Sequence, residues 1–365
     1  MENSQRFDHR HLPQLDGLRG IAVLIVIFGH LAMYDFGLGV ERLAPIAPTG
    51  VDLFFVLSGF LITGILWRTR QTERYYLNFY ARRALRIWPL YGLFLLFMFV
   101  WANRWIPVLA LPPGTHWQVF ALFIQNLWYQ QPDQMGMVLV VTWSLAVEEQ
   151  FYLVWPLGIS RLSRRVAAAV LAAAIVGAPI ARWLMAPHDY MNPICRCDAL
   201  AMGALLALWL ATCKPQRREI KNRALIVIAF GLCGEVIGLV TGARHVLQVT
   251  MVSAIFTGLL ALALVSNGLT RILSTPVLRF TGKVSYCLYL SHTIVCLLVL
   301  HLISGMGWTS RVIRIVIILA ASYGVATLSW HLIENPALKL KRHFESRNAV
   351  APEKPMREVF ESPAG

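Results

Sequence analysis

The chain has 365 residues, of which 57% are hydrophobic and 14% are charged, and its mean hydropathy is +0.58. Soluble domains carry about a quarter charged residues, so this composition excludes disordered and fibrous chains and nearly every soluble enzyme. The net charge of +14 would suggest nucleic-acid binding in a soluble protein, but the basic clusters lie between or beside apolar runs. We therefore expect an all-α polytopic membrane protein with cytoplasmic basic loops and no nucleic-acid partner.

Eleven apolar segments follow one another along the chain. At about 20 residues per crossing, they can supply about ten transmembrane helices and one shorter piece. The expected helices cover residues 18–36, 50–67, 84–102, 137–159, 166–185, 198–213, 223–242, 246–267, 284–304 and 311–332.

The remaining segment, 117–129, is predicted to be re-entrant or interfacial. It is short and carries Gln118, Gln125 and Asn126, which makes a full crossing unfavourable. If this segment does not cross the membrane, every later basic cluster lies on the same side as the arginine-containing N-terminus. Both termini are then expected to be cytoplasmic.

Outside the apolar segments, the chain is expected to have only polar ends. Residues 1–17 would form a cytoplasmic N-terminal segment without a cleavable signal pattern, and residues 337–365 a disordered polar cytoplasmic tail. The six cysteines fall mostly in apolar segments and lack metal-ligand spacing. Neither a disulfide framework nor a metal site is predicted.

Ionisable residues inside apolar segments are the best functional clue, because they are costly at membrane depth. Arg19 and His30 lie in the first segment, eleven residues apart. This spacing is about 20° past three full turns, so both side chains share a helix face, about 16 Å apart along the axis. Arg19 lies at the cytoplasmic end and His30 deep in the helix.

Further polar residues occur in four later segments: Asp52, Ser58, Glu148, Glu149, Asp198 and His292. Adjacent glutamates point about 100° apart, so at most one readily faces a given centre. One interpretation is that these residues only join helices through hydrogen bonds. Two neighbouring carboxylates in mid-membrane, with two histidines elsewhere, exceed that need and favour a functional site.

Six sequence motifs follow one another along the chain. The first is Leu15-Asp16-Gly17-Leu18-Arg19-Gly20-Ile21-Ala22, with His30 eleven residues after Arg19. The other five lie at 50–61, 80–89, 142–155, 196–205 and 282–292. In residues and in order, these motifs resemble those of the acyltransferase family 3 membrane acyltransferases. The resemblance identifies residues 18–336 as a membrane acyltransferase domain. Ser291 and Ala337 depart from the family pattern, at a tryptophan and a basic position respectively.

The resemblance implies an enzyme that moves an acyl group, usually acetyl from acetyl-CoA, to a hydroxyl of a saccharide, a lipid-linked glycan or a similar acceptor. Such O-acetyltransferases lie in the bacterial plasma (inner) membrane. His30 is the implied catalytic histidine and Arg19 its paired arginine. Glu148 or Glu149 matches an important acidic position, and Arg82, Arg83 and Arg86 match a second arginine motif.

This chemistry gives each residue an expected role. Acyl transfer from a thioester needs a base for the hydroxyl proton, which His30 would supply, and an anion site for the CoA phosphates. A carboxylate beside His30, Glu149 first and then Glu148 or Asp52, would fix its tautomer. Guanidinium groups suit phosphate, so the three arginines of the second motif would bind the donor.

Ser58, Asp198 and His292 are expected to support the site. Acyl-CoA is a co-substrate, no bound cofactor is expected, and the oligomeric state stays open. The pantetheine arm of CoA is about 15–20 Å long, comparable to the rise from Arg19 to His30, so a donor held at the cytoplasmic arginines could present its thioester at His30.

Two other functions would use the same residues. A proton-coupled transporter relays protons through such groups, but it predicts an inverted repeat or paired broken helices, and none is visible. An acyl-group translocator that carries acyl groups outward for a partner enzyme is the closer alternative. Membrane topology alone also explains most of the basic residues between Arg68 and Arg74.

Overall fold

The structure is a computed structural model that describes residues 12–33, 41–188, 190–303 and 307–344. Within these ranges every regular element is helical and no strand occurs. They include nine helices, or ten if a bent pair forms one span, that are long and apolar enough to cross a membrane. The predicted all-α polytopic fold is confirmed.

Seven of these helices are unbroken: α1 (Pro13–Met33), α2 (Ala47–Thr69), α9 (Arg164–Met185), α10 (Pro193–Cys213), α11 (Arg217–Thr241), α12 (Arg244–Val265) and α15 (Ser285–Leu302). Two others continue through a π-helical stretch. The helix α3 (Tyr75–Leu96) runs on through Phe97–Ala102 into α4 (Asn103–Trp105), and α16 (Trp308–Ser329) runs on through Trp330–Glu334 into α17 (Asn335–Lys339). Two shorter helices, α13 (Asn267–Leu273) and α14 (Pro276–Lys283), connect α12 to α15.

The segment predicted not to cross forms two short helices, α5 (Trp117–Ala121) and α6 (Gln125–Trp128). Neither is long enough to span a bilayer. After them, η4 (Pro132–Met135) and α7 (Gly136–Leu139) meet α8 (Thr142–Arg161) at an angle of 101°. Polar side chains bind the short piece to α8, since Gln150 donates to Asn126 (2.8 Å) and Gln125 donates to the Thr142 carbonyl (2.9 Å).

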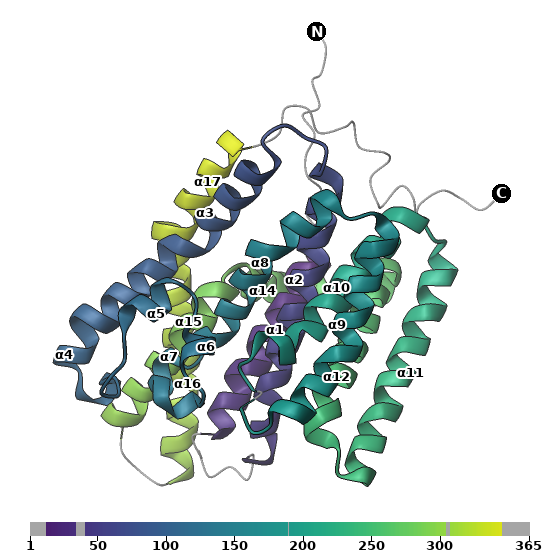
Figure 1. Cartoon of the computed structure of the whole chain (residues 1–365). Coiled ribbons are helices and arrows are strands. Elements are labelled where there is room, and N and C mark those ends of the chain that lie inside the picture. The colour runs from purple at the N-terminus through teal and green to yellow at the C-terminus, as the bar shows by residue number, and fades with distance from the viewer. Residues whose placement is uncertain (1–11, 34–40, 189, 304–306, 345–365) are drawn as a thin grey trace.

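The centre of the bundle is formed by α1, α2 and α10 (Figure 1). In α10 72% of the most apolar stretch is buried and in α2 67%, against 22% in α9 and α11. A Cβ atom at Gly59 would lie 1.9 Å from the Leu200 carbonyl oxygen, and one at Gly203 would lie 2.0 Å from that of Val56. The two glycines therefore let α2 and α10 approach backbone to backbone, as small residues do in membrane helix pairs.

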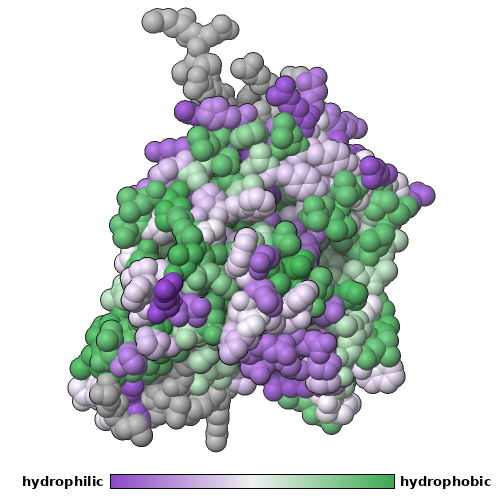
Figure 2. Space-filling view, turned by 60° about the vertical axis from the view of Figure 1, so that its left-hand side comes forward, coloured by the Kyte–Doolittle hydropathy of each residue, from purple (hydrophilic) through white to green (hydrophobic). Residues whose placement is uncertain are grey.

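Basic side chains gather at one end of the bundle, where α2 passes to α3, α8 to α9 and α10 to α11 (Figure 1). They are Arg68, Arg70, Arg74, Arg161, Arg164, Arg165, Lys214, Arg217 and Arg218. Figure 2 shows hydrophilic side chains at this upper end, hydrophobic areas on both flanks below it, and another hydrophilic patch toward the lower end. By the positive-inside rule, this end is expected to face the cytoplasm.

The C-terminal helix extends further than the sequence indicates. A polar tail is expected from residue 337, but α17 and a 3-10 stretch (Leu340–Phe344) continue the helical run along α3. Leu338, Lys341 and Phe344 are half-buried at helical spacing. These half-buried residues are too few to appear as an apolar segment in the sequence. They are nevertheless enough to pack the C-terminal helical run against α3. Residues 1–11 and 345–365 lie outside the described part of the chain.

Candidate active site

Two histidines from distant parts of the chain meet inside the bundle. His30 lies in the last turn of α1, and His292, 262 residues later, lies in α15, which packs against α1. The ring centroids are 5.0 Å apart, and Nε2 of His292 is 3.4 Å from Nδ1 of His30. His292 is fully buried, whereas His30 is half-buried. The structure thus brings together two of the residues that the sequence singles out.

The neighbour expected beside His30 was a carboxylate. Among the described residues, however, His30 makes no hydrogen bond or ion pair with Glu149, Glu148 or Asp52. Its Nδ1 faces the Val26 carbonyl oxygen at 2.9 Å and the buried His292 ring. The helix rotations that pack α1 against α15 therefore place an imidazole where the sequence favoured a carboxylate.

Glu148 lies in a cluster of hydroxyl groups between α2 and α8. Ser58 Oγ donates to its Oε1 (2.6 Å), and Tyr152, one turn further along α8, donates to its Oε2 (3.1 Å). The two hydroxyl oxygens are themselves 3.0 Å apart. The carboxylate of Glu148 is therefore held in one orientation by two donors, and Ser58 supports Glu148 directly.

Glu149 has a different environment, as its position about 100° further around the helix requires. It lies beside the Trp88 indole of α3 and within Coulombic range of Arg83. Its Oε1 is buried and makes no hydrogen bond to any described residue. A buried polar atom without a partner is costly, so this carboxylate is less well satisfied than that of Glu148, which two hydroxyl groups hold.

A cluster of cationic side chains lies toward the cytoplasmic end of the site: Arg19 of α1, Arg82, Arg83 and Arg86 of α3, and Lys341 of the C-terminal helical run. Lys341 is within Coulombic range of all four arginines, and Arg86 is within range of Arg19 and Arg83. Like charges gathered in a partly buried place repel one another. An anion bound among them would remove that repulsion.

Carboxylates among the described residues lie around this cationic cluster, and Glu148 and Glu149 are both within Coulombic range of Arg83. Asp16 is 3.8 Å from Arg19, and buried Glu334 lies within Coulombic range of Arg86 while its own Oε1 accepts a hydrogen bond from Ser329 (3.3 Å). Arg83 reaches toward the hydroxyl cluster, since its guanidinium lies 5.7 Å from the centroid of the Tyr152 ring. The cations and the carboxylates of α8 therefore form one continuous polar region.

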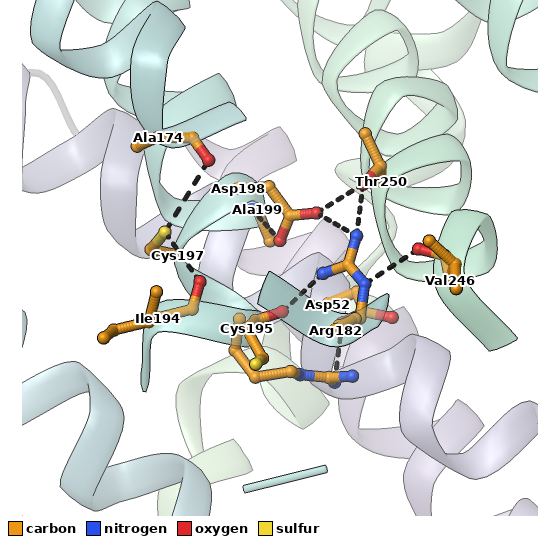
Figure 3. Close-up of polar contacts among 11 residues, drawn as sticks. Asp52, Ala174, Arg182, Ile194, Cys195, Cys197, Asp198, Ala199, Val246 and Thr250 are labelled. Atoms are coloured by element: carbon orange, nitrogen blue, oxygen red, sulfur yellow. Dashed lines mark hydrogen bonds and ion pairs between the residues drawn. The ribbon is translucent and has the colours of Figure 1, made fainter. Parts of the chain in front are cut away.

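Asp52 and Asp198 lie in separate, buried ion pairs. Arg196 binds Asp52 (2.8 Å) and Arg182 binds Asp198 (2.9 Å), and all four side chains are at most 4% exposed. Figure 3 shows Arg182 at the centre of these contacts. It also donates to the Val246 carbonyl (2.8 Å), to the Cys195 carbonyl and to Thr250, whose hydroxyl in turn donates to Asp198 (2.6 Å).

These ion pairs join α2 to α10, and α9 to α10 and α12. Each carboxylate is held by a buried guanidinium from another helix, which suits a role in helix association. The two predicted supporting aspartates are thus placed away from the contacts of His30.

Sequence reasoning missed Arg182, Arg196, Tyr152 and Lys341. A signal existed for three of them. Arg182 is ionisable within the apolar segment 166–185, Arg196 opens the next apolar helix, and Tyr152 follows Glu148 by four residues and so shares its helix face. For Lys341 the signal was weaker, because its helical face is short and interrupted by charges.

A family model described as an acyltransferase domain matches residues 12–331. The peptidoglycan O-acetyltransferase OatA of Listeria monocytogenes is 28% identical over 93% of this chain, and the putative peptidoglycan O-acetyltransferase YrhL of Bacillus subtilis is 29% identical over 90%. The O-acetyltransferase OatA of Staphylococcus aureus is 33% identical over 44% of this chain and 26% of its own length. The chain spans 58% and 55% of the first two relatives. No solved structure matches it.

Proposed function

This chain belongs to the acyltransferase domain family, and we propose that it transfers an acetyl group from acetyl-CoA to a hydroxyl group of a saccharide or lipid-linked glycan. The family resemblance seen in the sequence is confirmed, and the protein is an integral multi-pass membrane protein. Two of its relatives are named for peptidoglycan, which makes a cell-wall glycan the first acceptor to test. The bacterial plasma membrane is the proposed location.

The observation that carries the proposal is that one helix, α1, holds both a half-buried histidine and a member of the cationic cluster. Arg19 lies near the cytoplasmic end of α1, within range of the other cations, and His30 lies in its last turn. The helical rise between them is about 16 Å. This distance suits a donor whose charged nucleotide stays at the cationic cluster while its thioester reaches the histidine.

In the proposed reaction, His30 removes the proton from the acceptor hydroxyl as the oxygen attacks the thioester carbonyl. A C–O bond forms, the C–S bond breaks, and the CoA thiolate takes the proton back from the His30 imidazolium. The products are the acetyl ester and CoA. Atoms and charges balance without a metal or a redox partner.

The cationic cluster is proposed to bind the phosphates of CoA. Arg82, Arg83 and Arg86 offer guanidinium groups that form paired hydrogen bonds with phosphate oxygens, and Lys341 adds a point charge. Donor binding would offset the repulsion among these cations. Glu148 would hold Ser58 and Tyr152 in place by hydrogen bonds. The ring of Tyr152 would then position the Arg83 guanidinium for contact with the donor.

The test uses the purified protein in lipid nanodiscs with acetyl-CoA. Release of the CoA thiol is followed with a thiol reagent, with and without a muropeptide or glycan acceptor, and the acetyl ester is identified by mass spectrometry. We expect acceptor-dependent release, which His30→Ala lowers by at least about a hundredfold, the scale of a lost general base. Normal yield and unfolding temperature of the variant serve as its control.

Two outcomes would reject the proposal. Absence of CoA release with every glycan acceptor would remove acetyl-CoA as the donor. In sealed vesicles, acetyl label that crosses the membrane without any acceptor would instead identify an acyl-group translocator.

A further inference from the structure

We infer that His292 is the positioning residue for His30: it holds the proton of His30 on Nδ1, so that Nε2 is the atom that removes the acceptor's hydroxyl proton. The catalytic part of this inference rests on the proposed acetyl transfer. The tautomer itself follows from geometry alone and can be observed without turnover.

The first step assigns the proton of His292. Its Nδ1 lies 2.7 Å from the Tyr289 carbonyl oxygen and 3.2 Å from that of Leu288. Carbonyl oxygens only accept hydrogen bonds, so Nδ1 of His292 must be the donor. A neutral imidazole carries one N–H group, which leaves Nε2 of His292 with a lone pair.

The second step assigns the proton of His30. Its Nδ1 is 2.9 Å from the Val26 carbonyl oxygen and 3.4 Å from Nε2 of His292. Both of these atoms are acceptors, so the shared hydrogen belongs to His30. The opposite tautomer would turn a lone pair of His30 toward two other lone pairs. His30 therefore has its proton on Nδ1, and the lone pair of Nε2 is free to act as a base.

The neutral state of His292 follows from the same contacts. A second proton on His292 would lie on Nε2 and would face the N–H group of His30. His292 is also fully buried. Among the described residues, its other ring contact is with the uncharged Tyr289, and the two centroids are 6.0 Å apart. Burial without a counter-charge disfavours an imidazolium.

The hydrogen bond between the two rings becomes stronger during the reaction. When Nε2 of His30 takes the hydroxyl proton, the ring becomes an imidazolium, and its Nδ1–H group becomes a charge-assisted donor to His292. His292 thus stabilises the transition state more than the resting state, and an interaction of this kind raises kcat without changing donor affinity. In a Ser-His-Asp triad, a carboxylate accepts the hydrogen bond from Nδ1–H of the catalytic histidine, and His292 takes that role here.

Two substitutions separate this role from a structural one. His292→Gln keeps an acceptor oxygen close to the place of Nε2, whereas His292→Leu removes it. We expect the leucine variant to lose about ten- to a hundredfold in kcat, with an unchanged KM for acetyl-CoA, as for a hydrogen bond to a charged group. The glutamine variant should recover most of that loss. Thr293→Val, at the buried neighbouring position, is the matched control and should keep normal kcat.

The tautomer is measured separately, by two-bond ¹H–¹⁵N spectra of the protein labelled in its histidines. The signals of the pair are identified by their loss in His30→Gln and His292→Gln, and both should show the Nδ1–H pattern. An Nε2–H pattern for His30, or a glutamine variant as slow as the leucine variant, would overturn the inference. An Nδ1–H pattern in a protein that transfers no acetyl group would reject the proposed function and leave the tautomer intact.

Discussion

The guanidinium of Arg83 lies 5.7 Å from the centroid of the Tyr152 ring, and the hydroxyl of that tyrosine donates to Glu148. One side chain therefore contacts a member of the cationic cluster through its ring and a carboxylate through its hydroxyl. Arg83 comes from α3, and Tyr152 and Glu148 come from α8. The tyrosine therefore couples the position of Arg83 to that of the Glu148 carboxylate.

Substitutions at Tyr152 should separate these two contacts. Tyr152→Phe keeps the ring beneath Arg83 but loses the hydrogen bond to the Glu148 carboxylate, and we expect kcat to fall about ten- to a hundredfold, as for a hydrogen bond to a charged group. Tyr152→Leu removes the ring as well, so the KM for acetyl-CoA should also rise. Steady-state kinetics in nanodiscs measure both constants. Equal KM values for the two variants would show that the ring does not position Arg83.

Lys341 should contribute to donor binding although it lies beyond the predicted membrane domain. Burial and the four neighbouring arginines lower the pKa of Lys341 to about 6, so a bound phosphate would restore its charge. Lys341→Gln removes that charge, and we expect the KM for acetyl-CoA to rise about three- to tenfold at low salt. The effect should shrink as ionic strength increases, because screening weakens charge–charge attraction. The control is Lys339→Gln, an exposed lysine two residues earlier. An equal effect of both variants would indicate a general surface-charge effect.

The close approach of α2 and α10 should make Gly203 intolerant of a side chain. In Gly203→Ala the new Cβ would meet the Val56 carbonyl oxygen, and overpacking of this kind costs about 1–3 kcal/mol of unfolding free energy. Gly64→Ala, on the same pair of helices, is the control, because no atom lies within 4 Å of its Cβ position. Thermal unfolding in detergent compares the two. An unchanged Tm for Gly203→Ala would contradict the packing.

The Arg182–Asp198 ion pair should stabilise the fold only as a pair. Asp198→Leu leaves the Arg182 charge buried and unpaired, which costs about 3–5 kcal/mol of unfolding free energy. The double variant Arg182→Met with Asp198→Leu replaces both charges by apolar groups and should regain most of that loss. Unfolding midpoints of the single and double variants measure the recovery. If the double variant is no more stable than the single one, the contacts of Arg182 with α12 matter more than its pairing.

Positions of the membrane helices were predictable from the sequence alone. Expected spans at 50–67, 166–185 and 198–213 correspond to α2, α9 and α10 with ends shifted by a few residues. This succeeds because a helix in lipid satisfies its own backbone hydrogen bonds, so its location depends on local hydropathy. The ordered motifs likewise identified the family, and the polar residues within them pointed to His30, Glu148 and the arginines of α3.

Which polar side chains meet was decided only by the tertiary structure. Sequence reasoning favours Glu149 as the neighbour of His30, but the rotation of α8 turns Glu148 toward Ser58, and the packing of α1 on α15 puts His292 at His30. The same holds for Lys341, which joins the cationic cluster because the C-terminal helical run docks on α3. Hydropathy carries no information on helix rotation or on which helices become neighbours, since apolar faces are interchangeable toward lipid; close contacts such as Gly59 and Gly203 decide both.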